Sequence, residues 1–334
     1  MSDALRCDFC WHMCELKEGQ RGICGIREHR DNHLVTRGWG DIVAQSIDPI
    51  EKKPMYHFLP GARTFSCALF GCNYTCSFCQ NYAISQKHYF FTSSLHRTPE
   101  QLVEDFDCSG SPIMSYTYSD PVVWQDYMLE AAQLVHARGK LNCMVTNGSF
   151  SNTALERVLP AIDAFNIDVK GDDAFYRTYC SGSLKPVLDS VERIAADSNT
   201  VLEVTTLIIE EVHTEAMIRL MAEQLVERRV NVWHLSRFFP QFNMKDYRQT
   251  SDTYLQRMLA IAQEAGIPYV YAGNSALTEW DRTICPSCKT VLIHSHSYSG
   301  EAASDADVHI VNGRCSTCGY PIYGRFNFSQ VQSG

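Results

Sequence analysis

The 334-residue chain has no run of five Lys or Arg residues, and 38 acidic side chains outnumber 29 basic ones. Proteins that bind nucleic acid concentrate positive charge on one face to meet the phosphates. The net charge of −9 therefore argues against a nucleic-acid partner. Hydrophobic residues make up 45% and charged residues 20% of the chain, a composition that excludes intrinsic disorder.

Long apolar runs are missing as well. The N-terminus has no apolar segment of the kind found in secretory signals. The most apolar stretch, residues 201–209, is interrupted by Glu203 and is far too short to span a membrane. The sequence shows no internal repeat and no low-complexity tract. We therefore expect a cytoplasmic protein without a membrane partner.

Cysteine, in contrast, is abundant, with 15 residues. Clustered thiols in a reducing compartment typically bind metal, whereas single thiols there are core or surface residues. Three groups stand out here, one near each end of the chain and one in a central loop, so the sequence predicts a metalloprotein. The groups are Cys7, Cys10, Cys14 and Cys24; Cys72, Cys76 and Cys79; and Cys285, Cys288, Cys315 and Cys318.

Between residues 60 and 275, short apolar runs alternate with helix signals. We expect helices to begin after Thr98, near residue 122, after His213 and near Ser251, because capping residues, proline or acidic residues open these segments. Strands that alternate with helices form βαβ units and a parallel sheet, which binds ligands beyond the carboxyl ends of its strands. The expected strands are 64–70, 113–118, 142–146, 165–169, 201–209, 230–235 and 268–271.

The central cysteines follow the first expected strand with the spacing C-x3-C-x2-C. Three thiolates within eight residues can wrap one cubane iron–sulfur cluster and leave a fourth iron open to a small molecule. An open coordination position is typical of a catalytic metal site. Cys67 lies inside the strand and is better interpreted as a core thiol, while the alternative interpretation of the loop is a zinc site or three unrelated thiols.

The C-terminal cysteines form two C-x2-C knuckles separated by an expected hairpin of residues 291–298 and 308–311. This pattern favours a closed structural zinc site, with a rubredoxin-like single iron as the alternative. His294 and His296 share one face of the expected hairpin and are interpreted as exposed residues rather than ligands. The N-terminal set, C-x2-C-x3-C-x9-C, suits either zinc, with His12 as a substitute ligand, or an auxiliary iron–sulfur cluster.

The central motif, with Phe78 directly before the last cysteine, resembles the radical S-adenosylmethionine enzymes. The resemblance implies a partial (β/α)6 TIM-like barrel that holds a 4Fe–4S cluster on Cys72, Cys76 and Cys79. An external one-electron reductant would then drive cleavage of S-adenosylmethionine to a 5′-deoxyadenosyl radical, which abstracts hydrogen from a substrate. No catalytic side chain beyond the cluster ligands is identified.

The same resemblance implies that S-adenosylmethionine contacts residues at successive strand ends. Ser119 and Asp120 stand where the family carries a Gly-Gly-Glu type motif, with Asp in place of Glu and both glycines absent. Each position also has a plainer interpretation, such as a turn, a strand-end ion pair or a core histidine. The expected contacts are Phe78, Ser119, Asp120, Asn147, Asp168, Lys170 and His234.

Longer segments are similar to the radical enzyme of the AmmeMemoRadiSam system, which is related to pyruvate formate-lyase activating enzymes. They are residues 10–25, 48–61 and 234–238, and Phe239 departs from the family pattern. The resemblance implies Memo-type and AMME-syndrome-type proteins as partners. We expect an N-terminal cysteine-rich metal-binding segment (1–59), a radical barrel (60–280) and a zinc-ribbon-like C-terminal domain (281–334).

Two other functions fit the sequence. The first is an activating enzyme that installs a glycyl radical on a partner protein, although the two-cluster insertion of many such enzymes is absent after Cys79. The second is a non-catalytic metal-dependent scaffold or docking module, in which the central loop would hold zinc or a cluster without S-adenosylmethionine. The substrate does not follow from the sequence, whether it is a small molecule or a protein.

Overall fold

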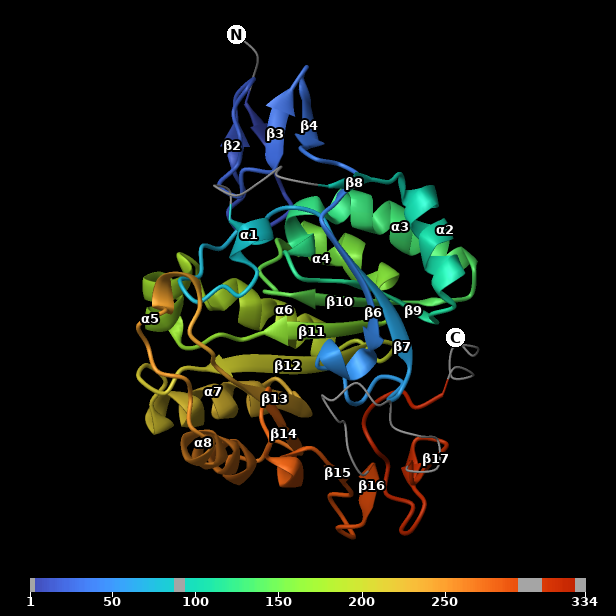
Figure 1. Cartoon of the computed structure of the whole chain (residues 1–334), viewed down its shortest axis with the longest axis vertical. Helices are drawn as coiled ribbons and strands as arrows, with labels where there is room; N and C mark the ends of the chain where they lie inside the picture. Colours follow the sequence, from blue (N-terminus) through green and yellow to red (C-terminus); the bar gives the residue numbers. More distant parts are fainter. Residues whose placement is uncertain (1–3, 87–93, 294–307, 328–334) are drawn as a thin grey trace.

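A single open sheet of eight strands organises the chain in the computed structural model, which describes residues 4–86, 94–293 and 308–327. The strand order is β14-β13-β12-β11-β10-β9-β7-β6, and every neighbouring pair is parallel except β6 and β7. Since β6 and β14 are both edges, the sheet curves without closing (Figure 1). The strands are β6 (Ala44–Pro49), β7 (Arg63–Ala68), β9 (Ile113–Tyr116), β10 (Leu141–Thr146), β11 (Ala164–Asp168), β12 (Val201–Ile208), β13 (Val232–Arg237) and β14 (Tyr269–Gly273).

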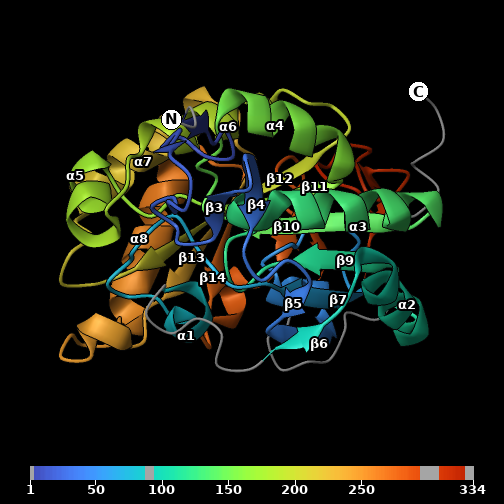
Figure 2. The same cartoon turned by 90° about the horizontal axis from the view of Figure 1, so that it is seen from above.

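The predicted α/β fold, a partial barrel of parallel strands, is confirmed. Seven strands lie within a few residues of their expected positions, and helices on the outer face follow them around the curve of the sheet (Figure 2). The edge strand β6 was not predicted; it joins the sheet from before the expected start of the barrel at residue 60. The outer helices are α2 (Pro99–Ser109), α3 (Gln125–Ala137), α4 (Asn152–Val158), α6 (Lys185–Ala195), α7 (Glu215–Glu227) and α8 (Asp252–Glu264).

Local sequence explains where several helices begin. Thr98 and Gln101 form a capping box at α2, in which each side chain accepts a hydrogen bond from the other residue's backbone N–H, and Pro99 occupies the first helical position. Thr214 and Ser251 cap α7 and α8 with their hydroxyl groups. The apolar faces of these helices cover the sheet in one continuous core, which includes fully buried Trp124 and Trp233.

The N-terminal region adds short hairpins to one side of the barrel. These are β1 (Leu5–Arg6) with β2 (Glu15–Leu16) and β3 (Arg27–Arg30) with β4 (His33–Thr36), while β5 (Asp41–Ile42) pairs with β8 (Leu95–His96). Arg27 anchors this region, because its guanidinium lies 2.8 Å from the Asp126 carboxylate on α3. A short helix, α1 (Tyr82–Ser85), and α5 (Asp173–Phe175) lie near the carboxyl ends of the strands.

The C-terminal region lies on the opposite side, near the amino ends of the last strands. Its pairs are β15 (Thr283–Ile284) with β16 (Val291–Ile293) and β17 (Ile310–Val311) with β18 (Arg314–Cys315). An antiparallel bridge joins Ile293 to Val308, where the hairpin was expected. The rest of that hairpin, with His294 and His296, lies outside the described residues.

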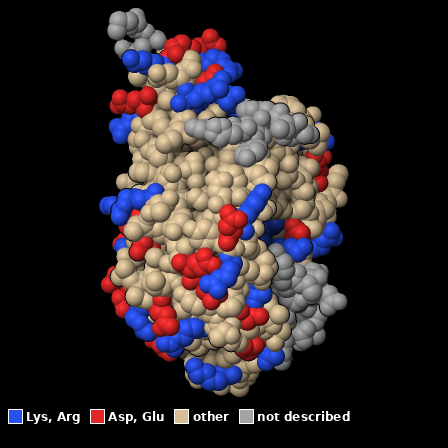
Figure 3. All heavy atoms as spheres, turned by 60° about the vertical axis from the view of Figure 1, so that its left-hand side comes forward, with Lys and Arg blue, Asp and Glu red and all other residues tan. Residues whose placement is uncertain are grey.

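Surface properties of the described part agree with the composition. Figure 3 shows acidic and basic side chains interspersed on one face of the molecule, with a broad uncharged area between them. No single-sign patch of the kind that attracts nucleic acid is visible on that face. Among the described residues, no helix combines the length and apolar character needed to cross a membrane.

Candidate active site

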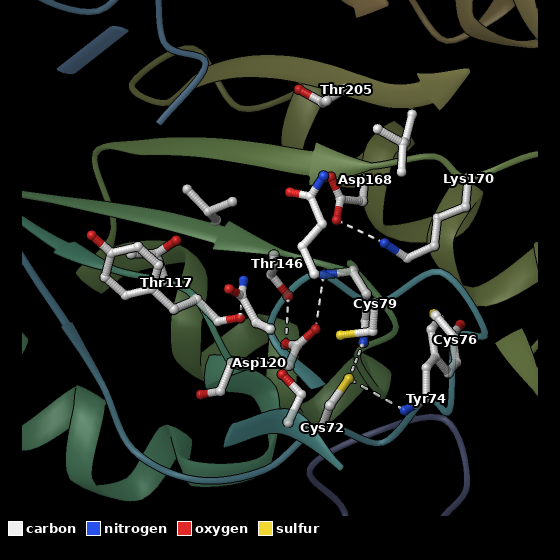
Figure 4. A pocket seen from close by; sticks show the side chains of 18 of the residues that line it. Cys72, Tyr74, Cys76, Cys79, Thr117, Asp120, Thr146, Asp168, Lys170 and Thr205 are labelled. Atoms are coloured by element: carbon white, nitrogen blue, oxygen red, sulfur yellow. Dashed lines mark hydrogen bonds and ion pairs between the residues drawn. The ribbon is translucent and has the colours of Figure 1, made fainter. Parts of the chain in front are cut away.

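A cavity of about 280 Å³ opens at the carboxyl ends of the parallel strands. This is the edge at which parallel sheets of α/β proteins bind their ligands. All three central cysteines line it, together with six of the seven residues expected to contact S-adenosylmethionine (Figure 4). The expected residues brought together here are Cys72, Cys76, Cys79, Phe78, Ser119, Asp120, Asn147, Asp168 and Lys170.

The cysteine loop leaves β7 through Gly71, whose φ of +111° favours glycine. A side chain there would also collide with Ile26, since an added Cβ would lie 2.3 Å from its Cγ1. Two backbone hydrogen bonds then fasten the loop to a π-helical turn, from Thr75 N to the Cys180 carbonyl (3.0 Å) and from Ser77 N to the Tyr179 carbonyl (2.8 Å). The loop is therefore preformed at the edge of the cavity.

The Cys76 side chain is buried, and those of Cys72 and Cys79 are partly buried. Burial raises the pKa of Cys72 well above its ordinary value and that of Cys79 to about 11, while a hydrogen bond with Cys180 and burial raise the pKa of Cys76. Thiols with such raised pKa values are protonated at neutral pH. Because metal binding requires thiolates, the positive charge of a bound metal would ionise them. The Tyr74 N–H points at Cys72 Sγ (3.4 Å), as it would at a ligated thiolate.

Asp120 lies at the centre of the polar wall. Its carboxylate accepts hydrogen bonds from Thr146 Oγ1 (2.9 Å), Asn147 N (2.9 Å) and Val122 N (3.1 Å). Burial raises its pKa to about 6, although these donors favour the charged form. At neutral pH the side chain is mostly ionised, and it offers a buried negative charge to a cationic ligand group.

Asn147 links the polar wall to the cysteine loop. Its Nδ2 donates to Asn73 Oδ1 (2.8 Å) and lies 3.6 Å from Cys72 Sγ. Ser119 is turned differently, because its hydroxyl donates to the Leu69 carbonyl and accepts from Trp124 Nε1 (3.0 Å). Ser119 therefore supports the end of β7, while Asn147 orients the cysteine loop.

Asp168 and Lys170 form an ion pair of 2.7 Å at the end of β11. Burial alone would lower the pKa of Lys170, but Asp168 and the nearby thiols of Cys76 and Cys180 raise it well above its usual value. Lys170 is thus a fixed positive charge facing the cysteine loop. Such a charge suits both thiolate ligands and the carboxylate of a small molecule.

His234 does not line the cavity. The strand was expected to end at residue 235, but β13 continues to Arg237, so His234 lies in its middle. There the imidazole Nε2 is 2.6 Å from the fully buried Glu203 carboxylate, and the ring stacks on Tyr271. The residue two positions further on the same face, Ser236, reaches the cavity instead.

Sequence reasoning missed several cavity residues. Thr205, Ser236 and Asn274 come from β12, β13 and the segment after β14, and only the correct strand register would have identified them. Tyr118 follows β9 with φ +67°. Its hydroxyl is 3.0 Å from Lys53 Nζ, in the segment that leads to Pro54 at the cavity wall.

The C-terminal cysteines form a compact group whose four Sγ atoms all lie within 4.8 Å of one another. Two of the distances are 3.7 Å, from Cys285 to Cys318 and from Cys288 to Cys315. A tetrahedron with zinc–sulfur bonds of about 2.3 Å has edges of about 3.8 Å. The group therefore fits one tetrahedral metal ion such as zinc.

The N-terminal cysteines gather without forming such a compact group. Among the described residues, the C-terminal set is the group of three or more ligands that lie close enough together to hold one metal ion. A Cβ placed on Gly22 would lie 3.7 Å from the sulfurs of both Cys14 and Cys24. His12, the possible substitute ligand, uses Nε2 to contact the Asn73 carbonyl at 3.2 Å.

The fold and site together define an open α/β barrel with a loop of three cysteines at its ligand-binding edge. Residues 68–234 match the radical SAM superfamily. An uncharacterised protein of Methanocaldococcus jannaschii is 35% identical over 323 residues, which cover 95% of both chains. The chain belongs to the radical SAM superfamily.

Two solved structures are similar to this chain, and the first of them shares its fold. Streptococcus suis SuiB bound to S-adenosylmethionine is 8% identical and has a TM-score of 0.51, over 71% of this chain and 56% of that one. A domain of a pyruvate-formate lyase-activating enzyme from Bacteroides vulgatus is 17% identical with a TM-score of 0.42, over 48% and 98% of the two chains.

Membership of the superfamily implies an enzyme with a 4Fe–4S cluster and S-adenosylmethionine as cofactors. This favours a catalytic protein over the non-catalytic scaffold considered from the sequence. It also implies an external reductant, since the sulfonium is cleaved after one-electron reduction.

Proposed function

We propose that Cys72, Cys76 and Cys79 hold the 4Fe–4S cluster and that S-adenosylmethionine occupies the adjoining cavity. The observation that carries this proposal is the cavity itself, which joins the buried thiol of Cys76 and the partly buried thiols of Cys72 and Cys79 to charged and amide side chains at the carboxyl edge of the sheet. When bound, these cofactors supply reductive cleavage of a carbon–sulfur bond and a 5′-deoxyadenosyl radical that removes hydrogen from the substrate.

The charged side chains on the cavity wall suit different groups of S-adenosylmethionine. The Asp120 carboxylate suits the ammonium group of S-adenosylmethionine, because it is buried and ionised at neutral pH. Lys170 suits the carboxylate group, and Asp168 both pairs with Lys170 and offers an acceptor for ribose hydroxyls. Phe78 closes the apolar side next to Cys79 and excludes water from the reacting centre.

The direct test is anaerobic formation of 5′-deoxyadenosine. The chain is reconstituted with iron and sulfide, and dithionite and S-adenosylmethionine are added to the wild type, to Cys76→Ala and to Cys108→Ala. Cys108 is an exposed cysteine outside all three groups and is the matched control. We expect product from the wild type and Cys108→Ala and at least a hundredfold less from Cys76→Ala. Equal product from all three would contradict the assignment.

We further propose that the protein is the radical enzyme of the AmmeMemoRadiSam system and acts with Memo-type and AMME-syndrome-type proteins. Supporting this, the segment of residues 48–61 reaches the active site, where Pro54 lines the cavity and Lys53 is buried over the Tyr118 ring (4.5 Å). The curated relative also matches across both terminal modules rather than the barrel alone.

The partner assignment can be tested with purified proteins. A Memo-type protein should bind the reconstituted enzyme and raise its rate of 5′-deoxyadenosine formation above that with S-adenosylmethionine alone. A glycyl-radical protein from the same genome is the comparison arm. Activation by the glycyl-radical protein, with an organic radical signal appearing on it, would replace the AmmeMemoRadiSam assignment by that of an activating enzyme.

A further inference from the structure

The N-terminal cysteines lie next to the active-site loop. Asn73, the residue after Cys72, interacts through its side chain with the Cys10 thiol. The Asn73 Oδ1 accepts a hydrogen bond from Asn147 Nδ2 (2.8 Å), and that same nitrogen lies 3.6 Å from Cys72 Sγ. A continuous set of contacts therefore runs from Cys10 through two asparagine amides to a ligand of the catalytic metal site.

Other contacts hold the two regions in this relation. The Trp11 N–H donates to the Ser149 carbonyl (3.1 Å), and Cys10 forms an antiparallel bridge with Phe150. Ile26 fills the space above Gly71, at the point where the catalytic loop begins. The N-terminal thiols are thus placed against the loop by packing and by backbone hydrogen bonds.

The surroundings of these thiols suit a negatively charged metal centre. Cys7, Cys10 and Cys24 are buried, and the N–H groups of Ile26 and Arg27 lie 3.4 and 3.5 Å from Cys24 Sγ. The Arg27 guanidinium lies against Cys7 and is only 5% exposed. Its Nε has no hydrogen-bond partner among the described residues, as expected if a bound sulfide or thiolate accepts from it.

We propose that Cys7, Cys10, Cys14 and Cys24 bind a second iron–sulfur cluster, which passes single electrons to the cluster on Cys72, Cys76 and Cys79. An external one-electron donor protein reduces the N-terminal cluster by one electron. The electron then moves to the catalytic cluster, and no bond or proton changes place in this step. The assignment of a cluster to the N-terminal cysteines does not depend on the proposed function. The electron-transfer role, in contrast, rests on the proposed catalytic cluster.

Spacing and position both favour a polynuclear cluster over zinc. One tetrahedral zinc ion draws four sulfurs to within about 4 Å of each other, and the C-terminal sulfurs already lie within 4.8 Å of one another. The N-terminal sulfurs do not form such a compact group in the described chain, and each could ligate a separate iron of a cubane. A structural zinc would also gain nothing from contact with the catalytic loop, whereas an electron carrier must lie close to its acceptor.

The first test removes the catalytic cluster. In Cys72/Cys76/Cys79→Ala, anaerobic reconstitution should leave about four iron and four sulfide per chain and an electron paramagnetic resonance signal after reduction. The single C-terminal zinc serves as an internal control for folding. A variant that holds two zinc ions and no iron would overturn the proposal.

Two further measurements are made on the wild type, and the first of them needs no variant. Anomalous scattering at the iron edge should show iron at both the N-terminal and the central cysteines; iron at the central site alone would overturn the proposal. Iron at the N-terminal site alone would instead contradict the catalytic cluster.

In the fully reduced wild type, spin coupling should broaden the electron paramagnetic resonance spectrum relative to the sum of the spectra of two single-cluster variants. A simple sum would overturn the electron-transfer role.

Discussion

The two terminal cysteine groups contain the same four ligands but differ in spacing and position. The C-terminal group is compact, has two exposed members, Cys288 and Cys318, and lies in the module near the amino ends of β13 and β14. The N-terminal group is not compact in this way, is mostly buried and touches the loop of the central cysteines. The comparison shows that ligand type alone does not identify a metal centre, whereas spacing and neighbours together can.

The two ends of the parallel sheet also have different expected roles, one structural and one catalytic. Tyr269 and Val232, at the amino ends of their strands, share a small apolar cluster with Cys285 and Cys315. In barrels of parallel strands, that end contributes stability while the carboxyl end carries the chemistry. We therefore expect a C-terminal metal to stabilise a module at the amino end of the sheet, and the proposed N-terminal cluster to lie near the end that carries the chemistry.

The largest expected effect is the complete loss of one metal centre, with the other retained, in each of two variants. Cys285→Ser should lose the zinc and keep its iron, and its C-terminal module should become protease-sensitive, because structural zinc contributes roughly 10–16 kcal/mol of binding free energy. Cys24→Ser should lose about four iron atoms and keep the zinc. Metal analysis with limited proteolysis tests both. Loss of zinc from Cys24→Ser would break the comparison.

The metal-free thiols should differ more than a hundredfold in reactivity. The hydrogen bond with Thr290 lowers the pKa of Cys288 to about 6, and burial raises that of Cys10 to about 12. The thiolate is the reactive form, so Cys288 should reach its full alkylation rate above pH 7. Cys10 should react tenfold faster with each pH unit up to pH 10. Mass spectrometry after pulsed iodoacetamide measures both, and similar rates at pH 7.5 would contradict the account.

A smaller effect is expected where the N-terminal region is anchored. Arg27→Gln should destabilise this region by about 2–4 kcal/mol, because it breaks a mostly buried ion pair with Asp126. Arg21→Gln is the matched control; the Arg21 side chain is 54% exposed beside Glu28, so its loss should cost less than about 1 kcal/mol. Urea unfolding followed by tryptophan fluorescence compares them, and equal effects would show that Arg27 is no anchor.

The smallest effect is expected at the anchor of the C-terminal module. The Tyr323 hydroxyl accepts from Leu202 N (2.7 Å) and donates to Leu202 O (3.1 Å) at the start of β12. Tyr323→Phe should cost about 1–2 kcal/mol of stability. It should leave the iron content and the 5′-deoxyadenosine yield unchanged, because the contact lies at the amino end of the sheet. A drop in yield at full iron content would link this module to catalysis.

Much of the fold was predictable because local signals were strong. Apolar runs gave the parallel strands, and the Thr98, Thr214 and Ser251 caps located the starts of three helices. The edge strand β6 (Ala44–Pro49) was missed, because its burial alternates only weakly and its partner is set by the sheet. The N-terminal hairpins were missed because several of their strands have only two residues.

The site was predictable where its residues lie close together in the sequence or directly follow a strand. The central cysteines and the residues directly after β9, β10 and β11 all reached the cavity. His234 did not, because a two-residue error in the end of β13 moves a side chain from the cavity into the core. The contacts of Cys180 with Cys76 and of Asn73 with Cys10 join distant segments, and no local pattern encodes them.

The most direct test of the central claim is the ratio of iron to zinc in the anaerobically reconstituted wild-type protein. Two cubane clusters and one tetrahedral zinc predict about eight iron atoms and one zinc ion per chain. About four iron atoms with two zinc ions would mean that the N-terminal group is structural. That result would contradict the distinction drawn here between the two ends of the molecule.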